Sequence, residues 1–340
     1  MMKKAIILVN TNNSAYNAGP KAQVDISNFL DKNGFEKIRL NVNNTSSISK
    51  LITAGFVLPR FGKKLSDMEE VIIQYPMSRF LMKNLIKTLR KHTQTKIYCV
   101  IHDVESLRMK ENDTSFKRDE LALLNSVDGL VIHNENMLNW LRENGLKTKV
   151  ALLQLFDYDN PQPLNKEINY GRSICFAGNL AKSTFLQDFH PKTFELSLYG
   201  IGLSSKIHDS NIKYQGAYSP TELPKYLTQS YGLMWDGNSI TSCDGVYGQY
   251  TKYNAPHKVS LYLSCGIPVI VWKKAGVAEY IVEHKLGIAI DSLTQLDSVL
   301  DKISFDEYKV LKENCLHEAK KLRNGEFISR TIKKLETKEM

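Results

Sequence analysis

The sequence lacks the features that mark a disulfide-bonded, zinc-binding or membrane-spanning protein. Its five cysteines are scattered, form no CxxC pair and do not group with histidine at zinc-ligand spacing. No run approaches the roughly eighteen apolar residues of a membrane span. The apolar run at residues 5–9 is too short for a signal peptide, and polar residues follow it directly. We therefore expect a soluble, cytoplasmic protein with reduced cysteines.

Motifs for dinucleotides and nucleic acids are also missing. The loop at residues 10–19 is rich in Thr, Asn and Ser and has no GxGxxG pattern, which argues against a nicotinamide or flavin site. The formal net charge is +9. Such an excess attracts polyanions, anionic lipid head groups or phosphorylated ligands, and an ordinary solvated surface is the alternative. Because no basic motif is interleaved with aromatics, we expect no nucleic-acid partner and at most peripheral membrane contact.

Short apolar runs alternate with helical patterns along the whole chain. This alternation predicts parallel sheets with crossover helices, and 340 residues suffice for two domains. Several runs are continuously apolar, as expected of strands covered on both faces. The expected strands are residues 5–9, 37–42, 71–75, 96–101, 129–132, 150–155, 173–176, 195–199, 213–215, 232–235, 268–271 and 287–290.

The segment 157–169, with two prolines and little apolar content, marks the best domain boundary. We predict a first domain at residues 1–156, a second at 157–318, and a C-terminal helix at 319–340 that could pack back on the first. Both domains are expected to be doubly wound, with a cleft at the carboxyl ends of their strands. Ser-Pro-Thr-Glu at 219–222 predicts a helix start with a capping box, and residues 305–335 predict one long helix.

The strongest chemical signal lies at residues 254–270. Pro256 suits the first turn of a helix, Gly266 would end that helix, and a strand would follow. In the turn that Pro256 opens, the unpaired backbone N–H groups of His257 and Lys258, with the lysine charge, would suit a diphosphate and neutralise it without a metal. The alternative is an ordinary strand–helix unit with an exposed lysine.

Two further segments carry weaker signals. After the strand at 173–176, Gly178 lets a ligand approach the backbone, and Asn179 and Lys182 can donate to phosphate or sugar oxygens, although Gly-Asn is also a common turn. Tyr218 and Asp236 each follow a strand, where Tyr218 could pack on a base. The loop at residues 237–253 is long and aromatic, which favours a lid or an acceptor-facing loop.

In the first half, His102 and Asp103 end the central strand candidate. A carboxylate there is placed to act as a general base on an acceptor hydroxyl, and His102 could do so instead. Alternatively Asp103 caps the next helix and His102 hydrogen-bonds within the fold. Gln74 ends another strand, and Thr11 and Asn12 follow the first; these three are candidate acceptor contacts or ordinary loop residues.

Seven short motifs occur in order along the chain: Gln74-Tyr-Pro76, Ile101-His-Asp-Val104, Phe176-Ala-Gly-Asn179, Gly216-Ala-Tyr-Ser-Pro-Thr-Glu-Leu223, Trp235-Asp236, Pro256-His-Lys258 and Cys265-Gly-Ile-Pro-Val-Ile270. Taken together, these motifs resemble GT-B glycosyltransferases, which have two Rossmann-like domains facing a cleft. More narrowly, the chain is similar to the bacterial glucosyltransferases that extend O-linked N-acetylglucosamine on serine-rich repeat adhesins, and to related polysaccharide galactofuranosyltransferases.

The resemblance implies transfer of a hexose, glucose from UDP-glucose, onto a glycan or glycosylated protein, with no metal or cofactor and as a homo-oligomer. It places His102 and Asp103 on the acceptor side of the cleft. It places Lys258 at the diphosphate, Gly178 and Asn179 at the donor, and Tyr218 and Asp236 beside the nucleotide. The loop at 237–253 departs from the family pattern and leaves the acceptor open. The alternatives are a polysaccharide galactofuranosyl- or hexosyltransferase and a non-catalytic sugar-nucleotide-binding scaffold.

Overall fold

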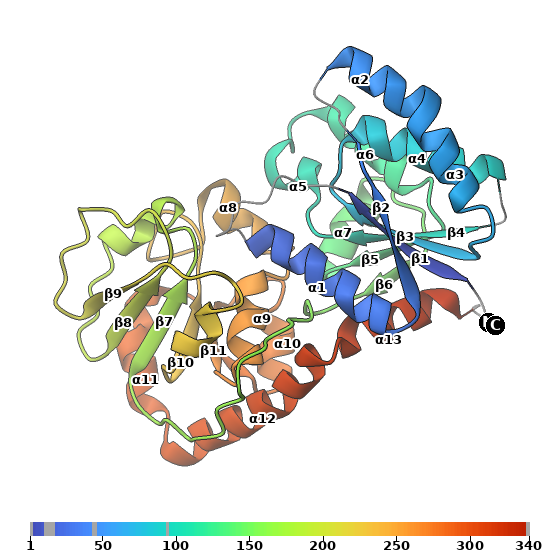
Figure 1. Cartoon of the computed structure of the whole chain (residues 1–340). Coiled ribbons are helices and arrows are strands. Elements are labelled where there is room, and N and C mark those ends of the chain that lie inside the picture. The colour runs from blue at the N-terminus through green and yellow to red at the C-terminus, as the bar shows by residue number, and fades with distance from the viewer. Residues whose placement is uncertain (1–2, 10–17, 43–45, 93–94, 338–340) are drawn as a thin grey trace. The chain divides into compact units, whose positions relative to one another are not determined.

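The computed structural model describes residues 3–9, 18–42, 46–92 and 95–337, and its contacts divide the chain into two compact units (Figure 1). Unit 1 contains residues 23–153 with the first strand and the end of the chain from Ile328. Unit 2 contains Gln154–Phe327 together with residues 18–22. Each unit is built on one six-stranded parallel sheet, so the fold is two-domain α/β, as the sequence predicts.

In unit 1 the strand order is β2-β1-β3-β4-β5-β6. The central strands β3, β4 and β5 are buried along almost their whole length, which explains why their sequences are mostly apolar and do not alternate with polar residues. The strand order reverses between β1 and β3. The strands are β1 (Lys4–Val9), β2 (Phe35–Leu40), β3 (Glu70–Tyr75), β4 (Lys96–Ile101), β5 (Gly129–Ile132) and β6 (Val150–Leu152).

Helices connect these parallel strands. Three of them begin at side-chain caps, because Ser46, Asp113 and Asn134 accept hydrogen bonds from the backbone N–H groups of Ser49, Phe116 and Met137, respectively. A π-helical turn (Thr53–Val57) joins the second helix to the third. The helices are α1 (Ala18–Lys32), α2 (Ser47–Ile52), α3 (Leu58–Lys64), α4 (Arg79–His92), α5 (Glu105–Met109), α6 (Thr114–Leu124) and α7 (Glu135–Glu143).

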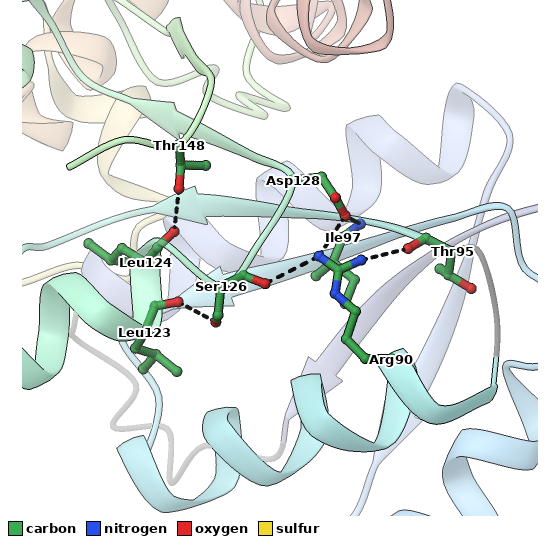
Figure 2. A network of polar contacts seen from close by, with 8 residues as sticks. All are labelled: Arg90, Thr95, Ile97, Leu123, Leu124, Ser126, Asp128 and Thr148. Atoms are coloured by element: carbon green, nitrogen blue, oxygen red, sulfur yellow. Dashed lines mark hydrogen bonds and ion pairs between the residues drawn. The ribbon is translucent and has the colours of Figure 1, made fainter.

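Arg90, near the end of α4, fastens the amino ends of β4 and β5 (Figure 2). Its guanidinium donates to the carbonyl oxygens of Thr95 and Ser126, each at 3.2 Å, and pairs with Asp128 at 2.8 Å. The same Asp128 carboxylate accepts from Ile97 N at 2.7 Å. One arginine therefore binds backbone carbonyl groups that precede β4 and β5, at the edge of the sheet opposite the carboxyl ends of the strands.

In unit 2 the strand order is β12-β11-β10-β7-β8-β9, and it reverses between β7 and β10. This is the order of a dinucleotide-binding Rossmann sheet, which places ligands at the carboxyl ends of the two strands flanking the reversal. The strands are β7 (Ser173–Ala177), β8 (Glu195–Tyr199), β9 (Ile212–Gly216), β10 (Tyr231–Met234), β11 (Val269–Trp272) and β12 (Gly287–Ile290). The helices are α8 (Gly245–Tyr250), α9 (His257–Ser264), α10 (Ala278–Glu283), α11 (Leu296–Lys302), α12 (Phe305–Arg323) and α13 (Glu326–Glu336), which continues into unit 1.

Each segment predicted as a strand contains one, with shifted ends where backbone conformation intervenes. The strand predicted at 150–155 stops at Leu152, because Gln154 adopts a positive φ of 71°. The strand predicted at 37–42 runs from Phe35 to Leu40, because Gly34, with φ of 88°, ends α1 and turns the chain at once.

Two helix predictions are wrong. Ser219 does bond Glu222 at 2.7 Å, but the chain forms only a 3-10 turn (Leu223–Tyr226), since Pro224 has no N–H to continue a helix. The predicted single helix at 305–335 is two helices. It is broken at Gly325, whose φ is 72°.

The last helix, α13, packs within unit 1 from Ile328 onward. Its Glu336 pairs with Lys4 of β1 at 2.6 Å. The Leu335 side chain comes so close to Gly129 of β5 that a Cβ there would lie 3.0 Å from it. The end of the chain thus completes the unit in which the chain begins.

Candidate functional site

The carboxyl ends of β7 and β10 in unit 2 bring together three residues that the sequence singled out separately. Gly178 follows β7, Asp236 follows β10, and Lys258 lies in the first turn of α9. The Lys258 Nζ is 3.1 Å from Asp236 Oδ1 and 3.4 Å from the Trp235 carbonyl oxygen. A Cβ built on Gly178 would lie 3.8 Å from the same nitrogen. These three residues form the Lys258 cluster, at the reversal of strand order.

The Lys258 ammonium is largely shielded from water by neighbouring side chains. Its side chain is only 17% exposed, and its nitrogen lies 4.7 Å from the centroid of the buried Phe176 ring. A partly desolvated ammonium interacts with an anion more strongly than one on an open surface does. The cluster therefore combines a fixed positive charge with a backbone that has no side chain at Gly178.

The start of α9 lies at this cluster. Pro256 is the N-cap, with φ −63° and ψ 130°, and the first intrahelical bond runs from Val259 N to Pro256 O. The backbone N–H groups of His257 and Lys258 precede that bond, so helix geometry gives them no intrahelical acceptor. This arrangement adds the positive end of the helix dipole to the lysine charge.

His257 contributes packing at this turn. Its ring lies 4.9 Å from the Tyr158 ring and 6.1 Å from the Phe156 ring, between centroids. Burial, with a smaller effect from the Lys21 ammonium, lowers the pKa of His257 to about 3, so the imidazole is neutral. Its Nε2 has no hydrogen-bond partner among the described residues. The ring thus fixes the orientation of the turn that carries Lys258.

The loop after β7 is pressed against the loop after β8. Gly178 N donates to Tyr199 O at 3.0 Å, and Gly200 has a φ of 137°. A Cβ on Gly200 would lie 1.8 Å from Gly178 O, so only glycine fits. Asn179 uses its side-chain oxygen locally, accepting from Ala181 N at 3.1 Å. Asn179, which is predicted to contact the donor, thus caps a short 3-10 turn.

Lys182 and Tyr218, two further predicted donor residues, each contact an aromatic ring. The Lys182 Nζ lies 4.6 Å from the ring centroid of Tyr247 in α8 and 3.4 Å from its hydroxyl. Tyr218 follows the edge strand β9, where it stacks on Tyr226 at 3.8 Å and donates to Gln215 O. Tyr218 therefore belongs to an aromatic pair at the sheet edge, two strands away from β7.

The segment 237–253, predicted to be one long loop, is a loop only as far as Asp244, because the helix α8 lies within it. The Asp244 carboxylate closes a compact turn by accepting from the backbone N–H groups of Asn238 and Ser239, and α8 begins directly after it. Trp235 Nε1 also donates to Ser239 O at 2.9 Å. Of the tyrosines that suggested a lid, Tyr247 and Tyr250 are carried on α8 and Tyr253 follows it, and Tyr250 is buried.

In unit 1, His102 and Gln74 form one hydrogen-bonded pair. Gln74 donates through Nε2 to Ser27 Oγ at 3.0 Å and to Gln23 O at 3.2 Å, so its Oε1 is the acceptor for His102 Nε2 at 2.8 Å. This assignment puts the histidine proton on Nε2. The internal hydrogen bond predicted as an alternative for His102 is confirmed.

Asp103 lies beside Arg108 and does not cap a helix. Its Oδ2 is 2.6 Å from Arg108 Nη1, and both side chains are 30% exposed. The N-cap of α5 is Val104, so the predicted capping role of Asp103 is wrong. The carboxylate thus stays near solvent at the carboxyl end of β4. Thr11 and Asn12 lie outside the described residues.

Sequence reasoning missed Glu120, which fixes the turn after Asp103. This fully buried carboxylate on α6 accepts from the backbone N–H groups of Glu105 and Ser106, each at 2.9 Å, and from the Tyr75 hydroxyl. It caps α5 from a distant part of the chain. Nothing in the sequence distinguishes Glu120 from its solvated neighbours, because its partners are fourteen or more residues away along the chain.

Across the residues that the structure describes, no helix has the length and apolar character of a membrane span. Within that same part of the chain, no three His, Cys, Asp or Glu side chains group as metal ligands would.

Two doubly wound α/β units in succession are the fold of the GT-B class of glycosyltransferases. The solved structure of Anabaena HepE in complex with UDP and glucose has this fold: the TM-score is 0.63 over 97% of this chain and 98% of that one, at 12% identity.

Two family models match the chain in succession. The N-terminal domain of the glucosyltransferase 3-like family matches residues 4–155, and its C-terminal domain matches residues 174–335. The chain belongs to the glucosyltransferase 3-like family and is a glycosyltransferase.

Curated relatives agree with this membership. The chain is 27% identical to the β-1,6-galactofuranosyltransferase WbbI of Escherichia coli K12 over 94% of both chains. It is 27% identical to glucosyltransferase 3 of Streptococcus gordonii over 71% of both. The resemblance seen in the sequence motifs is confirmed.

Proposed function

We propose that the protein is a metal-independent hexosyltransferase that uses a UDP-sugar, UDP-glucose, as donor. The observation that carries this proposal is the Lys258 cluster, where an ammonium group and the start of α9 meet at the strand reversal of unit 2. The UDP and glucose in the HepE complex support the donor class.

On the donor side, the diphosphate would lie against the first turn of α9. Backbone N–H groups of His257 and Lys258 would bind its oxygens, and Gly178 would leave room for it. As the bond between the anomeric carbon and the β-phosphate oxygen breaks, negative charge grows on the departing diphosphate. The Lys258 ammonium would stabilise that charge, which is the role a divalent metal plays in other transferases.

On the acceptor side, Asp103 would act as the general base. Its carboxylate takes the proton of the acceptor hydroxyl while that oxygen forms the new bond to the anomeric carbon. Arg108 orients the carboxylate, and Glu120 holds the turn that follows it. The buried Gln74 positions His102, which is the alternative base.

The acceptor that the resemblance suggests is O-linked N-acetylglucosamine on a serine-rich repeat adhesin. The match to streptococcal glucosyltransferase 3 supports glucose as the transferred sugar. A second candidate is polysaccharide galactofuranosyl transfer, which is favoured because the match to WbbI covers 94% of the chain. We also propose that the protein is a cytoplasmic homo-oligomer. Light scattering would measure the mass of that oligomer.

The test is a donor panel with matched variants. UDP-glucose, UDP-galactofuranose and other nucleotide sugars are offered with GlcNAc-bearing peptides or glycans, and transfer and UDP affinity are both measured. Asp103→Asn should lower transfer about a hundredfold with UDP affinity retained. Asp119→Asn, on an exposed aspartate of α6, is the control.

Two results would contradict the proposal. Full transfer by Asp103→Asn would remove Asp103 as the base. Wild-type protein that binds UDP but transfers no sugar from any donor would favour the alternative of a non-catalytic scaffold.

A further inference from the structure

The helix α2 of unit 1 turns its apolar side to solvent. None of its residues is buried. Ile48 and Leu51 are each 71% exposed, Ile52 is 51% exposed, and Phe56 in the following π-helical turn is 63% exposed. Their spacing of three and four residues places them on one stripe, which a globular protein normally buries. We call these four residues the exposed stripe.

The opposite side of the same segment is packed into unit 1. Thr53, Leu58, Phe61 and Leu65 are all at most 8% exposed. The π-helical turn (Thr53–Val57) winds more slowly than an α-helix, so it shifts the phase of the apolar pattern between α2 and α3. As a result the apolar residues of α3 face inward, while those of α2 stay outside. The segment is thus anchored and still presents large apolar side chains.

Basic residues surround this segment. Residues 41–96 contain ten Lys and Arg and three Asp and Glu, which accounts for +7 of the net charge of +9. Lys63 and Lys64 end α3. The neighbouring α4, which packs against α3 (Figure 1), has no carboxylate. It exposes Lys83, Lys87 and Lys91 at four-residue spacing.

We propose that the surface formed by α2, α3 and α4 binds an anionic phospholipid membrane. Helices that lie in the membrane interface combine an apolar face with lysine and arginine, and each basic residue near an anionic surface adds attraction. The exposed stripe supplies the first element, and the lysines of α3 and α4 supply the second. The stripe would insert among the acyl chains while the lysines stay at the head groups.

The observations disfavour other occupants of this surface. A second copy related by a two-fold axis would bring two surfaces of the same positive charge together. A nucleic acid would use the lysines but would leave four large apolar side chains without a partner. An anionic lipid surface accounts for both the charge and the stripe.

The test is co-sedimentation of the full chain with two kinds of vesicle. One is phosphatidylcholine alone, and the other contains about 30 mol% phosphatidylglycerol. We expect at least about tenfold tighter partitioning to the anionic vesicles, weakened by added salt because the attraction is partly electrostatic. Equal partitioning to both vesicles, or none to either, would overturn the proposal.

Paired variants test the exposed stripe and the lysines one at a time. Leu51→Ser with Phe56→Ser should lower partitioning about tenfold. The control is Val282→Ser with Val310→Ser, exposed valines of unit 2, which should change nothing. Lys63→Glu with Lys64→Glu should abolish the preference for anionic lipid, and Lys302→Glu with Lys309→Glu is its control.

Donor binding measured on the same samples keeps this proposal apart from the proposed function, since none of these substitutions lies in the Lys258 cluster. If the stripe variant partitions like wild type but changes the mass measured by light scattering, the surface is an interface between copies and the membrane proposal is wrong.

Discussion

Replacing Lys258 with methionine removes the positive charge of the cluster while keeping most of the side-chain volume. Two unit charges about 4 Å apart attract by about 4 kcal/mol at an effective dielectric constant near 20. Lys258 already contacts Asp236 at 3.1 Å, and it must give up part of that contact to meet a phosphate. We therefore expect a net loss of about 2 kcal/mol, typical of a charge-assisted hydrogen bond, or roughly thirtyfold in the Kd for UDP.

Titration calorimetry with UDP measures this loss directly. Lys273→Met is the matched control, since Lys273 is 65% exposed and pairs with Asp291 at 3.5 Å on the same sheet. Asp236→Asn added to Lys258→Met should recover part of the affinity, because the unpaired carboxylate would otherwise repel the diphosphate. If Lys258→Met binds UDP and transfers sugar like wild type, the diphosphate does not lie at this cluster.

Three further predictions concern the glycine contact, a buried histidine and metal. Gly200→Ala should lower the free energy of unfolding by about 3 kcal/mol, measured with urea, because its Cβ would meet Gly178 O at 1.8 Å; unchanged stability would refute that contact. Burial lowers the pKa of His133 from 6.5 to about 4. The unfolded chain therefore takes up the proton first, and stability that is present above pH 6.5 should fall by about 2 kcal/mol by pH 5. His133→Asn should flatten this dependence, and an unaltered pH profile would contradict the assignment. Transfer should persist in excess EDTA, and complete loss there would overturn the metal-free mechanism.

Much of the architecture follows from local patterns in the sequence. Continuous apolar runs such as the one at residues 129–132 favour strands buried on both faces, and their alternation with helices predicts parallel sheets. Pro256 and Gly266 bound α9 because their backbone restrictions act within one or two residues. For the same reason the sequence alone predicts that Lys258 lies at the start of a helix.

The failures arise where a specific contact or a backbone restriction overrides the local pattern, at short range for Asp244 and Pro224 and at longer range for Glu120. Asp244 folds the residues after Asp236 into a closed turn, which a reading of aromatic content could not reveal. Pro224 limits a good capping box to a 3-10 turn. Glu120 looks like any helix-surface carboxylate until the fold places it on the N–H groups of Glu105 and Ser106.

The sequence alone determined which segments are strands, where α9 begins and which residues follow the carboxyl ends of the strands, because these properties depend on neighbours in the chain. Only the tertiary structure decided that Gly178, Asp236 and Lys258 meet, since strand order is set by packing among segments as much as eighty residues apart. It also decided that the apolar side of α2 faces outward. Periodicity shows that a helix has an apolar stripe, but the rest of the fold determines whether anything covers it.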